Sequence, residues 1–155
     1  MAEERLIVKR PLVWYAAAAA PTTWVPIEGF VKKITLKAKR GKVDTKGYSD
    51  GGARNEKLDP EHEVEMSFYH SRTWSEFSDL LVTELNSDDP TWFRVKYRGA
   101  TAAGTGNRIF QYKVQLTDIG SIGGEMNTAS MADMTLPIEG KVQSSTDGTT
   151  FADYF

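Results

Sequence analysis

The sequence predicts a mainly β protein: an antiparallel β-sandwich or strongly curled barrel with one packed α-helix at about residues 73–86. Two observations carry this prediction. About five or six runs alternate apolar and polar side chains, as half-buried strands do. Only TWSEFSDLLVTELN instead repeats apolar residues at spacings of three and four, as a helix does. With 155 residues, of which 40% are hydrophobic and 26% charged, we expect a single domain over residues 1–155.

Residues 1–23 are predicted to form an N-terminal arm, with a short strand at Leu6–Val8 and an alanine linker. The stretch has some features of a secretory signal, but Glu3 and Glu4 occupy the place of its positive region and Pro11 interrupts it. Its apolar run is too short to span a membrane. These features favour an arm over a cleaved signal.

After the arm, apolar and polar residues first alternate, and residues 40–62 then show no such alternation. Ile34, Leu36 and Ala38 alternate with polar residues, which predicts a half-buried strand. Residues 40–62 contain four glycines and many charges and almost no large apolar residue. This stretch is too long for a hairpin turn, so we expect a long loop that serves as an interaction arm.

The rest of the chain is predicted to be strands around the helix. His62–His70 alternates, and 91–98 and 108–116 look like a long hairpin. In the last strand, 131–142, Pro137 falls among the outward residues, which predicts an edge position or a bulge. A polar C-terminal tail, residues 143–155, follows.

The helix is expected to begin with a capping box, because Thr73 and Glu76 have the required spacing. Glu84 is assigned to its polar side. Its apolar stripe needs a sheet to cover, and the residues predicted to pack on that sheet are Trp74, Phe77, Leu81 and Leu85.

Catalytic and metal-binding signals are poor. The chain has no cysteine. His62 and His70 are predicted at opposite ends of one strand, too far apart to share a metal or a proton relay. Asp44 and Asp50 lie in a stretch with some calcium-loop character, but it lacks regular ligand spacing and a closing glutamate. We therefore expect no enzyme activity, no cofactor and no metal.

Charge is unevenly spread. Residues 1–60 carry 12 Lys/Arg and 7 Asp/Glu, whereas residues 61–155 carry 7 and 14. The acidic part would repel phosphate, so the asymmetry is weak support for nucleic-acid binding. It suits either chance segregation or a surface that meets the opposite surface of another copy. A chain that does not associate with copies of itself is the alternative: a monomeric β-sandwich module that binds a carbohydrate or protein ligand. In that case Trp24, Trp74 and Trp92 are the candidates for a sugar-stacking platform.

Most of residues 24–142 resembles the major tail tube proteins of long-tailed (siphovirus-type) bacteriophages. The likeness rests on IEGFVKKITLKAK, the loop after it, WSEFSDLL, and RIFQYKVQLTDIGSIGGEMNTASMADMTLPIEGKV. It implies a structural subunit that forms stacked hexameric rings, with a lumen that conducts double-stranded DNA during ejection. It also implies assembly in the host cytoplasm, a place in the virion tail, and tape-measure, tail terminator and baseplate proteins as partners, without a membrane. Related inner tubes occur in contractile tails and tail-like injection systems.

The resemblance also implies site residues. The long loop would contact an adjacent ring through Lys42, Asp44, Lys46, Tyr48, Asp50, Arg54, Glu56 and Lys57. A channel for DNA should not bind it, so uncharged and acidic outward residues are the favoured lumen-facing candidates. Lys37 and Lys113 on the same strand faces count against a uniformly acidic lining. The candidates are Glu63, Glu65, Gln111, Gln115, Thr135 and Glu139.

Overall fold

The computed structural model describes residues 10–17, 23–44, 47, 51–52, 55–72, 77–99 and 102–155. Their main feature is an eight-stranded antiparallel sheet in the order β2-β1-β7-β8-β9-β6-β3, with β10 also paired to β9. Strands β4 and β5 form a separate two-stranded sheet. The elements are β1 (Leu12–Ala17), β2 (Val25–Pro26), β3 (Val31–Lys37), β4 (Arg40–Asp44), β5 (Asn55–Pro60), β6 (Glu63–Tyr69), α1 (Ser78–Leu85), β7 (Thr91–Lys96), β8 (Ile109–Val114), β9 (Met131–Ser145) and β10 (Ala152–Asp153).

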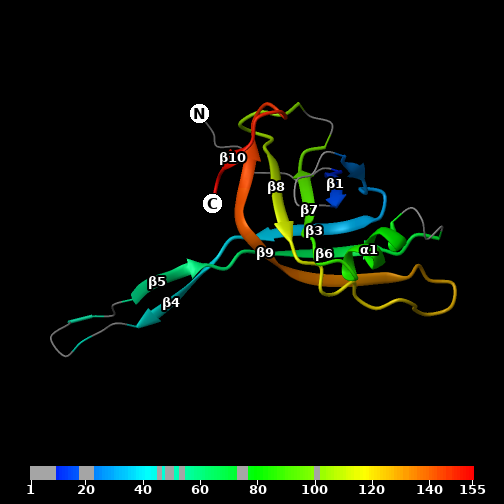
Figure 1. Ribbon diagram of the computed structural model, residues 1–155, viewed down its shortest axis with the longest axis horizontal. Coiled ribbons are helices and arrows are strands. Elements are labelled where there is room, and N and C mark those ends of the chain that lie inside the picture. The colour runs from blue at the N-terminus through cyan, green and yellow to red at the C-terminus, as the bar shows by residue number, and fades with distance from the viewer. Residues whose placement is uncertain are drawn as a thin grey trace.

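Strand β9 holds the two halves of the sheet together. Its first half pairs with β6 and its second half with β8. Opposite Gln111–Lys113 of β8, strand β9 runs from Gln143 to Glu139, so it bulges at this point. Gly140 lies in the bulge with a φ of 74°, a left-handed conformation that favours glycine. The bend curls the sheet into a half-barrel (Figure 1), which confirms the predicted curled antiparallel fold.

The hydrophobic core fills the inside of this curl. In β6 and β7 every second side chain points inward and is buried, so the period-two patterns of the sequence correspond to real buried faces there. Strand β6 is the clearest case, because its inward side chains are buried and its outward ones are half-exposed. The largest fully buried side chains come from five strands, from α1 and its N-cap residue, and from the turn before β3: Tyr112, Phe68, Phe77, Phe93, Ile27, Met66, Leu81, Leu136, Val13, Val64, Val95 and Val114.

Helix α1 closes the core, but it is shorter than predicted. Phe77 and Leu81 are fully buried, and the Phe77 ring lies 5.3 Å from Phe30 and 5.5 Å from Phe68 between ring centroids. Leu85 is 38% exposed, so its predicted packing role is wrong. Trp74 and the predicted capping box lie outside the described residues. The Ser78 N–H at the helix start instead donates to the Ser71 hydroxyl at 3.2 Å.

Glu84 was predicted on the polar side of the helix, and this is wrong. It shares the buried face with Leu81 and Ser78, three and six positions before it. Its carboxylate accepts a hydrogen bond from the Thr91 hydroxyl at 2.9 Å. Burial, followed by the nearby Glu84 carboxylate, raises the pKa of Tyr15 far above its usual value. This buried polar group therefore joins α1 to β1 and β7.

Three other predicted boundaries change. Within the predicted arm 1–23, Leu12–Ala17 form β1, an integral strand paired with β7; Leu6–Val8 lie outside the described residues. Residues 40–62 are not one long loop, because they contain the paired strands β4 and β5. The predicted tail 143–155 contains the end of β9, strand β10 and Phe155, which packs against the core.

We expect Leu81→Ala to destabilise the fold by about 2–5 kcal/mol, because it removes a fully buried side chain and leaves a cavity. Leu85→Ala is the matched control on the same helix, with an expected change within about 0.5 kcal/mol. Urea unfolding followed by tryptophan fluorescence measures both. Equal losses in the two variants would show that the helix does not present Leu81 to the core.

Candidate assembly surfaces

The curled sheet leaves one polar face uncovered. We call it the polar outer face, and it consists of the outward side chains of β3, β6 and the first half of β9. Charged and uncharged polar residues are neighbours across its strands: Glu65 lies opposite Thr35 of β3 on one side and Thr135 of β9 on the other. Ser67 donates a short hydrogen bond to the carboxylate of Asp133 at 2.5 Å. The face is formed by Lys33, Thr35, Lys37, Glu63, Glu65, Ser67, Asp133 and Thr135.

Five of the six lumen-facing candidates lie on this face or next to it. Glu63, Glu65 and Thr135 belong to it directly. Gln115 donates to Glu139 at 3.2 Å, which extends the polar surface onto the end of β8. The structure thus brings five of the candidates to one side of the sheet: Glu63, Glu65, Gln115, Thr135 and Glu139.

Gln111, the sixth candidate, is placed differently. Its side chain is buried between the neighbouring strands. The side-chain carbonyl oxygen accepts a hydrogen bond from Arg94 Nη2 at 2.6 Å, and the side-chain amide donates one to Gln143 at 3.0 Å. Sequence alternation assigned its face correctly but could not show that neighbouring strands cover it. Gln111 is therefore not available to touch a ligand or another subunit.

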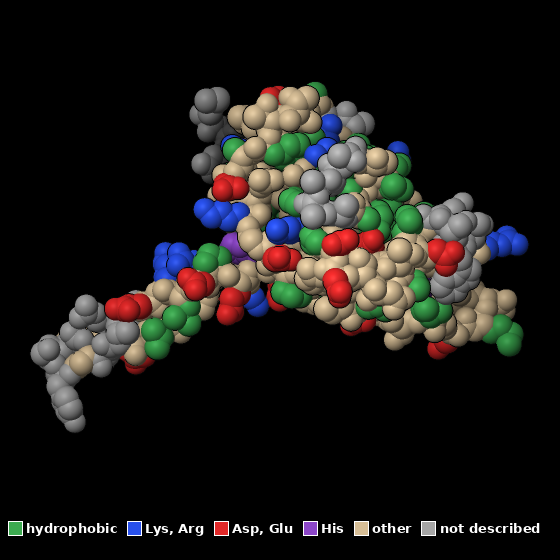
Figure 2. Space-filling view, viewed as in Figure 1, with side chains coloured by type: hydrophobic (Ala, Val, Ile, Leu, Met, Phe, Trp, Pro, Cys, Tyr) green, Lys and Arg blue, Asp and Glu red, His purple; other side chains and the backbone are tan. Residues whose placement is uncertain are grey.

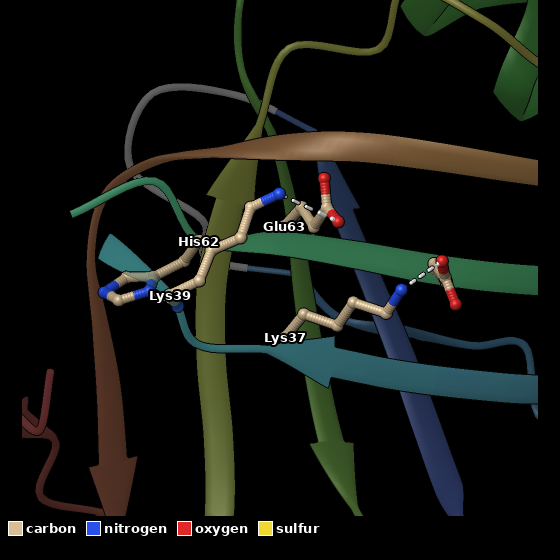
Figure 3. A network of polar contacts seen from close by, with 5 residues as sticks. Lys37, Lys39, His62 and Glu63 are labelled. Carbon is tan, nitrogen blue, oxygen red and sulfur yellow. Dashed lines mark hydrogen bonds and ion pairs between the residues drawn. The ribbon is translucent and has the colours of Figure 1, made fainter. Parts of the chain in front are cut away.

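Two lysines at the edge of the polar outer face are neutralised by glutamates (Figure 3). Lys37 forms an ion pair with Glu65, and Lys39 Nζ lies 3.3 Å from Glu63 Oε1. The hydrogen bond from Lys37 lowers the pKa of Glu65, and the same contact raises the pKa of Lys37. Because the pairs are exposed, they add little stability. Their effect is to turn a potentially basic strip into a locally neutral one.

The β4–β5 hairpin is a continuation of β3 and β6. The pairings Lys37–Glu63 and Arg40–Pro60 share one register, and between them the Glu61 N–H donates to the Lys39 carbonyl at 2.8 Å. At this junction the Lys39 N–H donates to His62 Nδ1 at 3.0 Å (Figure 3). Beyond it the hairpin projects away from the half-barrel (Figure 1).

His62 fixes the root of this hairpin. Its ring is buried and meets the Phe155 ring edge-on, with centroids 4.9 Å apart. The prediction that His62 and His70 stand at opposite ends of one strand is confirmed, since β6 lies between them. Their role as anchors of two projecting segments was missed, because sequence spacing alone did not show what each ring would contact.

The hairpin has two chemically distinct faces. Lys42 lies directly opposite Lys57 on one face, and Val43 lies opposite Glu56 on the other. Leu58, two residues after Glu56, contributes to the second face and is exposed like Val43. Among the predicted inter-ring residues, Lys42, Asp44, Glu56 and Lys57 thus lie on described strands. Lys46, Tyr48, Asp50 and Arg54 lie outside the described residues.

The connection between β8 and β9 forms a second projecting segment that sequence reasoning did not single out as a surface. We call residues 117–130 the β8–β9 loop. His70 anchors it: its Nε2 lies 3.2 Å from the Ser121 carbonyl, and its backbone N–H donates to the Ser130 carbonyl at 3.0 Å. Met126 in this loop is 90% exposed, and Ile122 and neighbouring Met131 are also exposed.

The tryptophan platform for a carbohydrate is not formed by the described residues. The Arg94 guanidinium lies 4.0 Å from the ring centroid of Trp24 and 4.5 Å from that of Phe151, so it occupies the space between them. Burial of this guanidinium lowers the pKa of Arg94. Trp92 lies beside Lys113, and Trp74 is outside the described residues. The aromatic rings on this side serve to hold Arg94.

Within the described ranges, no three His, Asp or Glu side chains come together in a way that could hold a metal ion. Among the same residues, no helix is long and apolar enough to cross a bilayer.

No protein-family model and no curated protein sequence matches this chain. Solved structures do resemble it. A chain of the virion of a native gene transfer agent particle matches with a TM-score of 0.62 at 12% identity, covering 88% of this chain and 95% of that one. A chain from the tail of an empty gene transfer agent particle, refined with C6 symmetry, matches with a TM-score of 0.59 at 12% identity, covering 86% and 93%.

A third match comes from a different kind of particle. A chain of the six-fold symmetrised baseplate of the anti-feeding prophage matches with a TM-score of 0.58 at 10% identity, covering 94% of this chain and 97% of that one. The three structures are phage-like tail or virion particles, and the likeness extends over nearly the whole length of each chain. At these identities the likeness shows a shared fold.

We expect the pKa of the Glu65 carboxyl to lie below the usual value for a glutamate, because ionised Glu65 accepts a hydrogen bond from Lys37. Lys37→Met removes that donor, so the pKa of Glu65 should rise toward its usual value. Carboxyl-detected NMR titration of both proteins measures the change. A Glu65 pKa that is identical in the two proteins would contradict the ion pair on the polar outer face.

Proposed function

We propose that this chain is a structural subunit of a phage-type tail tube: six copies form a ring, rings stack into a hollow tube, and double-stranded DNA passes through its lumen during ejection. The observation that carries the proposal is the one-sided sheet, which has a continuous polar outer face over a buried core. The particles it resembles support the assignment, because one is a tail refined with C6 symmetry and another a six-fold baseplate.

A polar outer face suits the wall of a water-filled channel. DNA phosphates are attracted to clustered lysines and arginines, and a surface that holds DNA would oppose its passage. On this face Lys37 is paired with Glu65, and Asp133 adds a further carboxylate. The face is thus mixed in charge rather than basic, which we propose allows DNA to slide without binding.

The sheet edges supply a way to close the wall. Strand β3 lies at one end of the sheet order, and among the described residues its one partner strand is β6. Unpaired edges of this kind are prone to pair with other chains. We propose that the β3 edge pairs with a neighbouring subunit of the ring, so that six copies close into a barrel without free edges.

The remaining roles follow from that assignment. As a tail subunit it would be assembled in the host cytoplasm, reside in the virion tail, and meet tape-measure, tail terminator and baseplate proteins. It would act without enzymatic activity, because its task is to form a wall. The β4–β5 hairpin is proposed as the contact to an adjacent ring.

Negative-stain microscopy of the purified chain over a range of concentrations tests the proposal. We expect rings or tubes with a central channel. Assembly should weaken as ionic strength rises if oppositely charged surfaces contribute to stacking. Strictly monomeric particles at high concentration would contradict the tube and favour a monomeric binding module.

We expect deletion of residues 43–57 to abolish stacking without unfolding the subunit. The deletion removes the outer hairpin but leaves His62 and the root contact at Lys39. Circular dichroism should show a folded chain, and microscopy should show rings or single subunits without long tubes. Tubes of normal length would show that the hairpin is not the connector between rings.

A further inference from the structure

The β4–β5 hairpin is connected to the half-barrel by an irregular joint. Residues 38–39 and 61–62 link the two sheets and belong to neither of them. Just beyond them the register of β4 and β5 shifts between Arg40 and Lys42, and Pro60 has no N–H to donate to the ladder. A segment attached through such a joint can pivot unless a further contact holds it.

His62 supplies that contact. The Glu61 N–H donates to the Lys39 carbonyl at 2.8 Å, whereas the Lys39 N–H donates to Nδ1 of His62 at 3.0 Å and not to a backbone carbonyl. The imidazole thus completes the ladder at the joint. The ring also packs against the ring of Phe155, and the backbone of Phe155 is hydrogen-bonded to Val142 of β9. His62 therefore links the root of the hairpin to the half-barrel.

The direction of this hydrogen bond fixes the protonation state of the ring. A backbone N–H can only donate, so Nδ1 of His62 must offer its lone pair, and the ring is neutral with its proton on Nε2. Protonation of the ring would place a second N–H on Nδ1, facing the Lys39 N–H across the same 3.0 Å. Two donors cannot form a hydrogen bond with each other, so the contact is lost when the ring becomes charged.

The surroundings of the ring do not hold an imidazolium in place either. No carboxylate of the described residues lines the hollow beside it, and the basic residues that do are Lys39, Arg40, Lys42 and Lys57. Figure 2 shows basic side chains gathered where the hairpin leaves the half-barrel, next to a histidine. A charged ring would add a further positive group there, and like charges repel.

Carboxylates elsewhere around the ring have other partners or lie outside the hollow. Glu63 is engaged by Lys39, Glu139 accepts from Gln115, and Asp153 lies 3.9 Å from Lys141. The charged side chains of the described segments next to the ring, beyond those that line the hollow, are Asp59, Glu61, Glu63, Glu139, Lys141 and Asp153.

We propose that His62 is an acid-sensitive latch, which holds the β4–β5 hairpin in one orientation while its ring is neutral and releases the hairpin when its ring is protonated. Histidine side chains titrate around pH 6.5, so the release falls between about pH 7.5 and about pH 5.5. The effect on assembly rests on the proposed tube, in which the hairpin contacts an adjacent ring. A hairpin without a fixed orientation makes that contact poorly, so acidification should separate the rings.

Two measurements on single subunits at low concentration test the latch without any tube. Nitrogen-15 NMR at about pH 7.5 should show Nδ1 of His62 without a proton, and a proton on Nδ1 at this pH would overturn the proposal. Because the chain has no cysteine, a fluorophore attached to Leu58→Cys reports the motion of the hairpin alone. Its anisotropy should fall between about pH 7.5 and about pH 5.5, and an unchanged anisotropy would equally overturn the latch.

Substitutions separate the titration of His62 from its packing. His62→Asn offers a side-chain carbonyl oxygen near the place of Nδ1 and does not titrate, so its hairpin should be equally ordered at both pH values. His62→Phe keeps a ring against Phe155 without the acceptor, so its hairpin should be mobile at both. His70→Gln is the matched control, because His70 is the other histidine of the chain, and it should respond like the unaltered protein. A pH response that survives His62→Asn or disappears in His70→Gln would contradict the latch.

Microscopy of the assembled chain connects the latch to the tube. Tubes formed at about pH 7.5 should shorten or separate into rings at about pH 5.5, whereas tubes of His62→Asn should keep their length. Unaltered tubes that keep their full length in acid would overturn the role of the latch in assembly and leave the tube itself intact. Failure to form tubes at either pH would instead overturn the proposed function, while the NMR and anisotropy results on single subunits would still decide whether His62 holds the hairpin.

Discussion

The bend in β9 is the constraint on which the rest of the structure depends. A single strand pairs with β6 before the bend and with β8 after it, so the two halves of the sheet cannot separate without breaking one ladder. The bulge around Gly140 turns the strand where the partners change. Because the sheet curls, its inner faces meet and bury the core, and α1 needs to cover only the opening that remains.

The same bend explains why the outer face is polar. A flat sheet with one apolar face would need a second layer to cover that face, whereas the curled sheet buries most of its apolar face against itself. The outward side chains of β3, β6 and β9 are therefore not needed for the core and can be polar. The two projecting segments lie at the two ends of β6, and each is held there by a contact with a histidine.

Much of the fold could be predicted from the sequence, because alternation marks a strand with one buried face. The strands 63–69, 91–96 and 109–114 were found in this way. The β4–β5 hairpin was missed because its described side chains are mostly exposed on both faces, so burial imposes no period of two on it. Glu84 was assigned to the polar side because it is charged, although its spacing from Leu81 places it on the buried face. The partners that make its burial possible, Thr91 and Tyr15, come from strands distant in the sequence. The burial of Gln111 could not be predicted for the same reason, because its hydrogen-bond partners Arg94 and Gln143 come from neighbouring strands.

The central claim is that the polar outer face lines the lumen of a tube. A helical reconstruction of the assembled chain by electron cryomicroscopy tests it most directly, because it shows the inner wall residue by residue. The account predicts that Glu65, Thr135 and Glu139 face the channel, with α1 on the side away from it. A tube whose inner wall is formed by other residues, with Glu65 and Thr135 on its outer surface, would contradict it.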